Sequence, residues 1–349
     1  MSLRPFFNQV LNSSGSDHVQ CTFEWLSLWL KHLGQDSELF TLLAQKGGET
    51  IGIAPLLIHR RAAVYKGIVK LRTLSFLGHG FTDNSDFLIA KDRAEVTGAF
   101  LDYAFQNQEL WDEIRLTQLS DASPNFELVE RGLSREGYEV EIEPLIGCPY
   151  LQLEGNFDSY YEGLGKNLRR DVAKKTRRLE EAGVELDFNV VTQIHEGQLR
   201  ELRELNRMRF EATQHRSFFL DEQRYNFVSD VAKTFNKNQW WRLFLFRSKG
   251  SLVAYRLCFA YNKTIYDWNT SYDVDYFKYS LGKILLKPVL AYCFNEGYRV
   301  FDFMAGEEDY KLKWTEKVRT NYQFSVQKIN LKTKLAKAYS EARKRLKKR

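Results

Sequence analysis

Cysteines are scarce in this sequence and widely separated. The four form no C-x-x-C pair, so we expect neither a disulfide scaffold nor a metal site; they are Cys21, Cys148, Cys258 and Cys293. A reducing cytoplasm is the default compartment for such a chain. The sequence also lacks HExxH, a Ser-His-Asp order and GxxxxGK[ST], which argues against zinc proteases, triad hydrolases and P-loop NTPases.

Long apolar runs are lacking too. No stretch approaches the roughly 20 residues that a membrane span needs. The first ten residues, MSLRPFFNQV, have no apolar core of the kind that predicts a signal peptide. Apolar residues nevertheless make up 44% of the chain and aromatic residues 14%, which is enough for sizeable cores. The length of 349 residues predicts about two domains.

Positive charge is concentrated at one end of the chain. The net charge is +6, but residues 330–349 carry nine basic residues and one acidic residue, so residues 1–329 sum to −2. This argues against a nucleic-acid-binding body. The apolar positions of the tail recur at helical spacing; they are Leu331, Leu335, Tyr339, Ala342 and Leu346. They predict an amphipathic helix that could lie on an anionic membrane surface, with a solvated tail as the alternative.

One order of elements is predicted twice. Strands with glycine turns, an apolar helix and a short strand are expected at residues 39–60, 96–107 and 111–119, and again at 241–272, 281–297 and 298–304. Helices are also expected at 22–34, 157–183 and 196–214. We therefore expect an α/β (α+β) protein with two tandem copies of one fold, each a mixed twisted sheet flanked by helices.

A domain boundary is expected within residues 143–155, where Pro144, Gly147 and Pro149 cluster. The expected domains are residues 1–148, a second domain at 149–329 and the basic tail at 330–349.

The stretch YFKYSLGKILLK, residues 276–287, predicts the start of a helix. Ser280 is a suitable N-cap, and Gly282 would let a ligand approach the backbone closely. A helix start with free N–H groups and nearby lysines suits an anion such as a phosphate. The alternative is an ordinary capped helix with solvated lysines. Pro288 should kink this helix or remove a hydrogen bond.

Residues 271–317 present further motifs in a fixed succession. They are Tyr279 and Gly282 at the helix start, Asp302 in FDF, Gly306, the YK pair Tyr310 and Lys311, and Trp314. With Trp25, Trp29 and APL at 54–56, this succession resembles the GNAT acyltransferase superfamily in its doubled, FemAB-like and CelD-like branch.

The resemblance implies that acyl-CoA lies in a gap where one strand splays from its neighbour. It implies a pyrophosphate site at the helix start, with cofactor-binding residues Phe277, Lys278, Tyr279, Ser280, Leu281, Gly282 and Lys283. No metal is implied. The first copy lacks a comparable helix start, and we interpret it as a degenerate, structural domain.

Three residues are candidates for proton transfer in acyl transfer. Asp302 alternates with two phenylalanines on a predicted strand, so it should face the cleft and act as a base; the alternative is a structural pair with Lys311 or Arg299. Asp267 is the second candidate base, and Tyr310 is the candidate acid for the leaving thiolate.

Two basic residues are candidates for substrate binding. Lys311 could bind an anionic substrate, with a surface charge as the alternative. Arg170 lies in a basic predicted helix that could hold a phosphate-bearing or polysaccharide-linked acceptor, or could simply be solvated.

The expected function is an acyl-CoA-dependent N- or O-acyltransferase, an acetyltransferase in its simplest form. Its acceptor would be a small molecule, glycan or lipid-linked compound of the cell envelope or of polysaccharide biosynthesis. The alternatives are an aminoacyl-tRNA-dependent peptidoglycan-bridge ligase of FemAB type and a non-catalytic scaffold.

Overall fold

The structure is a computed structural model that describes residues 4–62, 69–213, 218–330, 333–339 and 342. The chain divides into two compact units. The first comprises Met1–Ile146 and Thr320–Arg349, and the second comprises Gly147–Arg319. The first unit therefore includes the segment from Thr320 onwards, part of which the sequence had assigned to the second domain.

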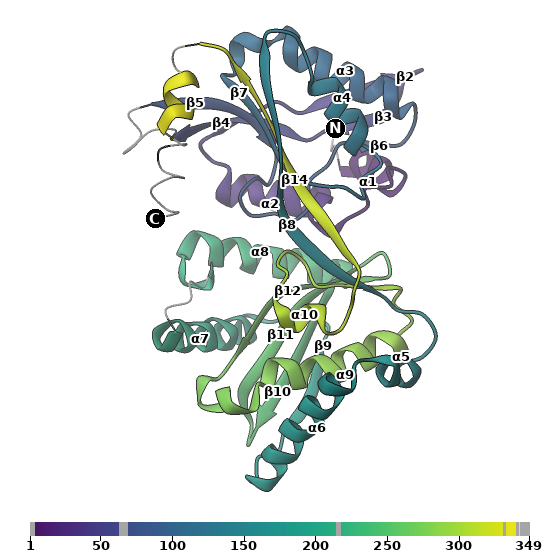
Figure 1. The fold of residues 1–349 in the computed structure, drawn as a ribbon, viewed down its shortest axis with the longest axis vertical. Coiled ribbons are helices and arrows are strands. Elements are labelled where there is room, and N and C mark those ends of the chain that lie inside the picture. Colours follow the sequence, from purple (N-terminus) through teal and green to yellow (C-terminus); the bar gives the residue numbers. More distant parts are fainter. Residues whose placement is uncertain (1–3, 63–68, 214–217, 331–332, 340–341, 343–349) are drawn as a thin grey trace. The chain divides into compact units, whose positions relative to one another are not determined.

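The first unit contributes strands in the order β1-β4-β5-β7-β14-β8 to a sheet of eleven strands, and β2-β3-β6 form a smaller sheet. The strands are β1 (Ser37–Leu39), β2 (Leu42–Lys46), β3 (Glu49–Ala54), β4 (Leu56–Ala62), β5 (Lys70–Phe76), β6 (Leu88–Ile89), β7 (Glu113–Ser120), β8 (Tyr138–Gln152) and β14 (Val318–Lys328). The helices are α1 (Arg4–Asn12), α2 (Phe23–Leu33), α3 (Arg93–Gln106) and α4 (Phe126–Leu133) (Figure 1). The core of this unit lies between the sheets and helices α3 and α4.

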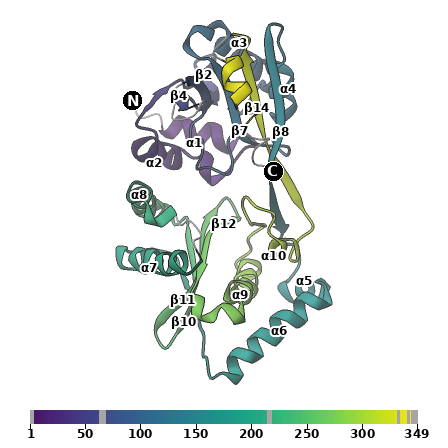
Figure 2. The same cartoon turned by 60° about the vertical axis from the view of Figure 1, so that its left-hand side comes forward.

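In the second unit the strand order is β8-β13-β12-β11-β10-β9. These strands are β9 (Asp187–Val191), β10 (Trp241–Ser248), β11 (Ser251–Tyr261), β12 (Thr264–Tyr272) and β13 (Val300–Asp302), with the last part of β8. The helices are α5 (Phe157–Gly163), α6 (Lys166–Glu181), α7 (Glu196–Thr213), α8 (Glu222–Asn238), α9 (Leu281–Asn295) and α10 (Asp309–Leu312). Helices α7 and α8 cover one face of the sheet, and α9 and α6 cover the other (Figures 1 and 2).

Helix α9 is buried on most of its surface because its sequence is apolar almost all round. It forms the centre of the core of the second unit; its buried residues are Leu281, Ile284, Leu285, Leu286, Val289, Leu290 and Cys293. Pro288 lies inside the helix without ending it.

The strand pairing confirms the predicted mixed α/β fold with repeated elements. In the first unit β4 and β5 are antiparallel, and α3 connects β5 to β7, which pairs with β5 in parallel. In the second unit β11 and β12 are antiparallel, and α9 connects β12 to the parallel β13. The hairpin β2–β3 turns at Gly47 and Gly48, whose φ angles of 60° and 81° favour glycine.

Two predicted segments differ in detail. The predicted helix 157–183 is two helices, α5 and α6, which are separated at Leu164 and Gly165. Of the predicted tail stripe, Leu331 and Leu346 lie outside the described residues. Within the described part of the tail helix, Thr333 and Ala336 are buried whereas Leu335 is 52% exposed. Leu335 of the predicted stripe thus does not pack into the protein, and contact of this stripe with a membrane stays a prediction.

The described helices include none that is both long and apolar enough to cross a lipid bilayer. The four cysteines are buried and unbonded to one another. Among the described residues, no group of histidine, cysteine and acidic side chains could hold a metal ion.

Candidate active site

Strands β12 and β13 separate soon after they meet. They pair over three positions, the last being Tyr266 opposite Asp302, where β13 ends. β12 continues to Tyr272. Strand β12 has a bulge just after this last paired position. Two consecutive residues of β11 pair with Asp267 and Asn269, so the register skips one residue of β12. Bulges redirect a strand and are common beside active sites, and here the bulge lies where the two strands part.

Helix α9 starts beside this gap. A short 3-10 helix, Val274–Tyr279, leads to Ser280, whose backbone is left-handed (φ 53°, ψ 55°). The prediction that the Ser280 side chain caps the helix is wrong, because its Oγ accepts a hydrogen bond from Lys175 Nζ at 2.9 Å instead. Helical geometry leaves the N–H groups of Leu281 and Gly282 without intrahelical acceptors, whereas the N–H of Lys283 donates to the Ser280 carbonyl at 2.9 Å. The N–H groups of Leu281 and Gly282 and the ammonium groups of Lys175 and Lys283 suit an anion; both lysines also pair with Asp171, at 3.1 and 3.3 Å.

Helix α3 of the first unit begins with the same left-handed backbone conformation as α9, but its N-cap residue is acidic. Asp92 occupies the N-cap with φ 51° and ψ 42°, again without a capping hydrogen bond. Its carboxylate pairs with Lys46 (Nζ–Oδ2 2.6 Å), and Glu95 follows in the first turn. An anion at this helix start would meet two acidic side chains. The backbone feature that the sequence placed only in the second copy is therefore present in both. The two helix starts differ in where the acidic groups lie: Asp92 and Glu95 belong to α3 itself, whereas Asp171 near α9 belongs to α6 and pairs with two lysines.

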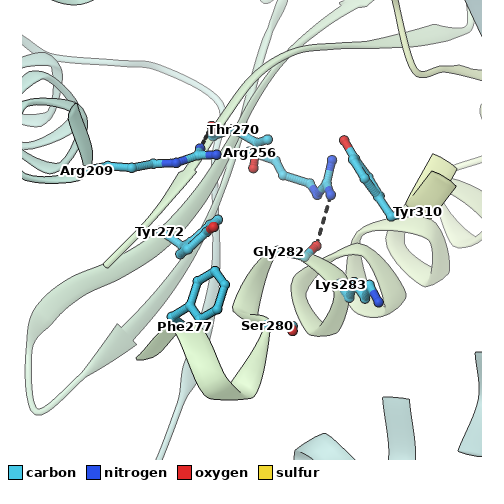
Figure 3. Close-up of a pocket in the computed structure, with 9 residues that line it drawn as sticks. All are labelled: Arg209, Arg256, Thr270, Tyr272, Phe277, Ser280, Gly282, Lys283 and Tyr310. Carbon is cyan, nitrogen blue, oxygen red and sulfur yellow. Dashed lines mark hydrogen bonds between the residues drawn. The ribbon is translucent and has the colours of Figure 1, made fainter. Parts of the chain in front are cut away.

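A cavity of about 250 Å³ lies at the start of α9 (Figure 3). Its lining comes from α7, β11, β12, the 3-10 helix, α9 and α10; the residues are Arg209, Arg256, Thr270, Tyr272, Phe277, Ser280, Gly282, Lys283 and Tyr310. Three of these nine side chains are cationic and none is acidic. The lining therefore favours a ligand that carries negative charge.

Arg256 is the most deeply buried cation of the cavity, with 1% of its surface exposed. It forms an ion pair with Asp267, and its Nη2 donates a hydrogen bond to the carbonyl of Gly282 at 2.9 Å. Its Nε has no hydrogen-bond partner among the described residues. Burial opposes the charged form, but Asp267 and Tyr310 outweigh it and raise the pKa of Arg256. The guanidinium is therefore a permanent positive charge at the cavity wall.

Tyr310, which belongs to α10, lines the cavity next to Arg256. The Arg256 Cζ atom lies 5.8 Å from the centre of the tyrosine ring. Burial raises the pKa of the Tyr310 phenol, and Arg256 only partly offsets this effect. The phenol therefore keeps its proton at neutral pH and can donate it to a leaving group.

Arg209 reaches the cavity from α7. Its Nη1 donates to the carbonyl of Thr270 at 3.1 Å, its Cζ lies 4.6 Å from the Tyr272 ring centre, and its Nε has no hydrogen-bond partner among the described residues. Sequence analysis missed Arg209 and Arg256. A signal existed only for Arg256, which is the one charged residue in the otherwise apolar strand SLVAYRLCFAY.

The structure brings together five of the predicted site residues at the cavity; they are Phe277, Ser280, Gly282, Lys283 and Tyr310. Three other residues of the predicted cofactor segment lie outside its lining. Lys278 is exposed, with its Nζ 4.9 Å from the ring centre of Tyr279, and Leu281 is fully buried in the core.

Asp302 and Lys311 also lie outside the lining and have structural partners. Asp302 is 2% exposed, pairs with Arg319 and accepts a hydrogen bond from the N–H of Met304 at 2.8 Å. It therefore does not face the cavity as the strand alternation predicted. Lys311 Nζ donates to the carbonyls of Ala305 and Gly306 at 3.0 and 3.1 Å and pairs with Glu308.

The remaining two predicted residues are also placed away from the cavity. Asp267 does not line the cavity, but it forms an ion pair with the lining residue Arg256 and balances its charge. Arg170 is exposed on α6.

The described geometry agrees with a sequence comparison. Residues 166–312 match the family of acetyltransferase (GNAT) domains. The match lies within the second unit and includes helix α9 and the lining of the cavity. The search of curated proteins gave no match.

Solved structures with low sequence identity show the same fold over almost the whole chain. FemX is 11% identical, with a TM-score of 0.64 and coverage of 97% of this chain and 98% of that chain. The C-terminal domain of a putative lysylphosphatidylglycerol synthetase from Agrobacterium fabrum is 11% identical, with a TM-score of 0.56 and coverage of 97% and 94%. L-PGS from Bacillus licheniformis is 16% identical, with a TM-score of 0.55 and coverage of 88% and 92%.

Within the matched residues the cavity lies where β12 has left β13 and where α9 begins. This is the place that the resemblance predicted for the acyl donor. Its lining combines a helix N-terminus, cations and a protonated tyrosine, which are the groups that could bind a phosphate-bearing donor and protonate its leaving group.

Proposed function

We propose that the protein transfers an acyl group from acyl-CoA to an amine or hydroxyl of an acceptor from the cell envelope or polysaccharide metabolism. The observation that carries the proposal is the cationic cavity at the start of α9, beside the gap between β12 and β13. The N–H groups of Leu281 and Gly282, together with the Lys283 side chain that pairs with Asp171, would bind the pyrophosphate of the donor. Gly282 leaves room for it, because a Cβ at this position would meet only Tyr272 Cδ1, at 4.0 Å.

The chemistry that follows needs one bond to form and one to break. The acceptor nitrogen or oxygen attacks the thioester carbonyl and forms the new C–N or C–O bond, and the C–S bond breaks. The proton of the acceptor passes to water, and the thiolate takes a proton from a protein group that water then reprotonates. Tyr310 is the proposed donor of the thiolate proton because its phenol is protonated and lines the cavity. Backbone N–H groups of β12 beyond Tyr266 are the proposed donors to the thioester oxygen, since β13 no longer runs beside them.

Arg256 and Asp267 have a proposed positioning role. The ion pair, together with the hydrogen bond from Arg256 to Gly282, connects β11 and β12 to the first turn of α9. This connection holds the phosphate-binding end of the cavity at a fixed place relative to the gap. Asp267 is thus a partner of Arg256 in this proposal rather than a base, and Asp302 is a partner of Arg319.

A second candidate is transfer of an aminoacyl group from tRNA. The similarity in fold to FemX and to a protein named lysylphosphatidylglycerol synthetase favours it, because the latter name describes an amino acid attached to a lipid. The cationic cavity would then receive the anionic end of the charged tRNA or an anionic acceptor.

Calorimetry separates the two candidates. Purified full-length protein is titrated with acetyl-CoA, with CoA and with an aminoacyl-tRNA mixture. We expect acetyl-CoA and CoA to bind and to compete with each other. Binding of charged tRNA alone would overturn the acyl-CoA proposal and support the second candidate.

A further inference from the structure

The first unit contains a larger cavity that the proposed reaction does not use. Its volume is about 470 Å³, and it lies among α1, α2 and strands β1 to β3. Its lining is Phe6, Phe7, Phe23, Leu26, Ser27, Leu30, Leu39, Thr41, Leu43, Gln45, Gly48, Thr50, Ile53 and Leu77. Small-molecule sites span roughly 300–1,000 Å³ and are lined mainly by apolar side chains, so this cavity has the size and character of a ligand site.

The lining offers almost nothing to a polar ligand. None of its side chains is charged. The hydroxyls of Ser27 and Thr41 already donate to backbone carbonyls, at 3.2 and 3.3 Å, and the amide of Gln45 donates to the Thr50 hydroxyl at 3.4 Å. A sugar, nucleotide or charged peptide would lose its hydration here without replacement hydrogen bonds. The surface that remains available is hydrocarbon.

The cavity runs from the surface into the core. At its floor, Leu26, Ile53 and Leu77 are 4%, 1% and 8% exposed. At its rim, Phe6 and Leu39 are 48% and 58% exposed. A flat protein partner would cover the rim but not reach the floor. A narrow, flexible apolar chain can reach both, and it would remove rim and floor surface from water together.

We propose that this cavity binds an unbranched alkyl chain, such as the hydrocarbon part of a fatty acyl or lipid molecule. The first unit would then be a lipid-binding domain rather than only a structural one. The proposal rests on the lining of this cavity alone and is independent of the reaction that the second unit performs.

A series of n-alkanols from hexanol to dodecanol tests the proposal on the full-length protein by calorimetry. Each added methylene that is buried should tighten binding about fourfold. The gain should stop at the chain length that fills the cavity. An affinity that does not rise with chain length would overturn the proposal.

Leu43→Glu supplies the matched variant. Leu43 lines the cavity and is 46% exposed, so a glutamate is tolerated in the folded chain but places a carboxylate against the alkyl chain. We expect dodecanol affinity to fall at least about tenfold. Leu110→Glu is the control, because Leu110 is 41% exposed in the same unit and outside the lining; its dodecanol affinity should be unchanged.

Sedimentation velocity tests a different occupant. We expect the wild-type protein to keep one sedimentation coefficient across concentrations, with or without dodecanol. A concentration-dependent dimer that Leu43→Glu abolishes would assign the cavity to a second copy of the chain and overturn the alkyl-chain proposal. Equal dodecanol affinity in Leu43→Glu and wild type would also overturn it.

Discussion

Replacing Gly282 by glutamate should separate the stability of the protein from its affinity for acyl-CoA. Gly282 lies in the first turn of α9, where a Cβ would meet no atom closer than Tyr272 Cδ1 at 4.0 Å. Glutamate therefore fits sterically. It has a higher helix propensity than glycine and interacts favourably with a helix N-terminus, so the free energy of unfolding should stay equal or rise by about 1 kcal/mol.

The affinity for acetyl-CoA should change in the opposite direction. The new carboxylate would compete with the pyrophosphate for the N–H groups of the first turn and repel it. Two unit charges about 4 Å apart repel by about 4 kcal/mol at an effective dielectric constant of 20. A glutamate side chain that swings away reduces this cost. We therefore expect a loss between about 1.4 and 4 kcal/mol, or at least about tenfold in Kd.

Two variants control for size and flexibility. Gly282→Gln has the shape of glutamate without the charge, and Gly282→Ala adds only a methyl group. Calorimetry with acetyl-CoA should show a small loss for glutamine, little change for alanine and the large loss for glutamate. Added salt should reduce the glutamate effect because it screens the repulsion. A folded Gly282→Glu protein that binds acetyl-CoA as tightly as wild type would refute the phosphate site.

Three further outcomes are expected. Tyr310→Phe should lower kcat by about 10²-fold or more, with the Kd of acetyl-CoA unchanged, in a thiol-release assay; an unaltered kcat would exclude Tyr310 as the acid. Asp302→Asn should leave the Arg319 guanidinium without its counter-charge and lower the free energy of unfolding by about 3 kcal/mol, while calorimetry shows unchanged acetyl-CoA binding. A stable Asp302→Asn protein without turnover would instead restore Asp302 as a base. Burial lowers the pKa of His79 from 6.5 to about 4, so the unfolded chain binds the proton more tightly; stability to urea should fall as the pH drops from about 6.5 to about 4, by up to about 3 kcal/mol, and His79→Gln should reduce this dependence.

The parts of the fold that local sequence patterns encode were predictable. Apolar periodicity and glycine turns indicated hairpins and helices of both copies, and the order of elements indicated the repeat. Other elements were not predicted, among them α4, α8, β5, β8, β9 and β14. The proline and glycine cluster at residues 143–155 was harder to interpret. It coincides with the division between the units at Ile146, yet the chain passes through it as one strand, β8.

Only the part of the site that comes from one short stretch of the chain could be predicted from the sequence. Residues of the 277–283 segment and Tyr310 follow from one motif and do line the cavity. Arg209 and Arg256 come from other elements, and only the folded sheet and α7 bring them to it. The same limit explains why the partner of Ser280 was missed, because Lys175 lies 105 residues earlier in the chain. A pattern of neighbouring residues cannot show which distant charge will neutralise a carboxylate or occupy a hydroxyl.

The division of the chain also has a consequence for synthesis on the ribosome. The first unit is interrupted in sequence, since all of Gly147–Arg319 is made before its strand β14. β14 stands between β7 and β8 in the order of strands, so the amino-terminal segment lacks an internal strand until the last residues emerge. The second unit is continuous and can complete its sheet first. We therefore expect the folding order to be reversed relative to the order of translation. Until β14 is made, β7 pairs only with β5 and β8 only with β13, so each exposes one edge.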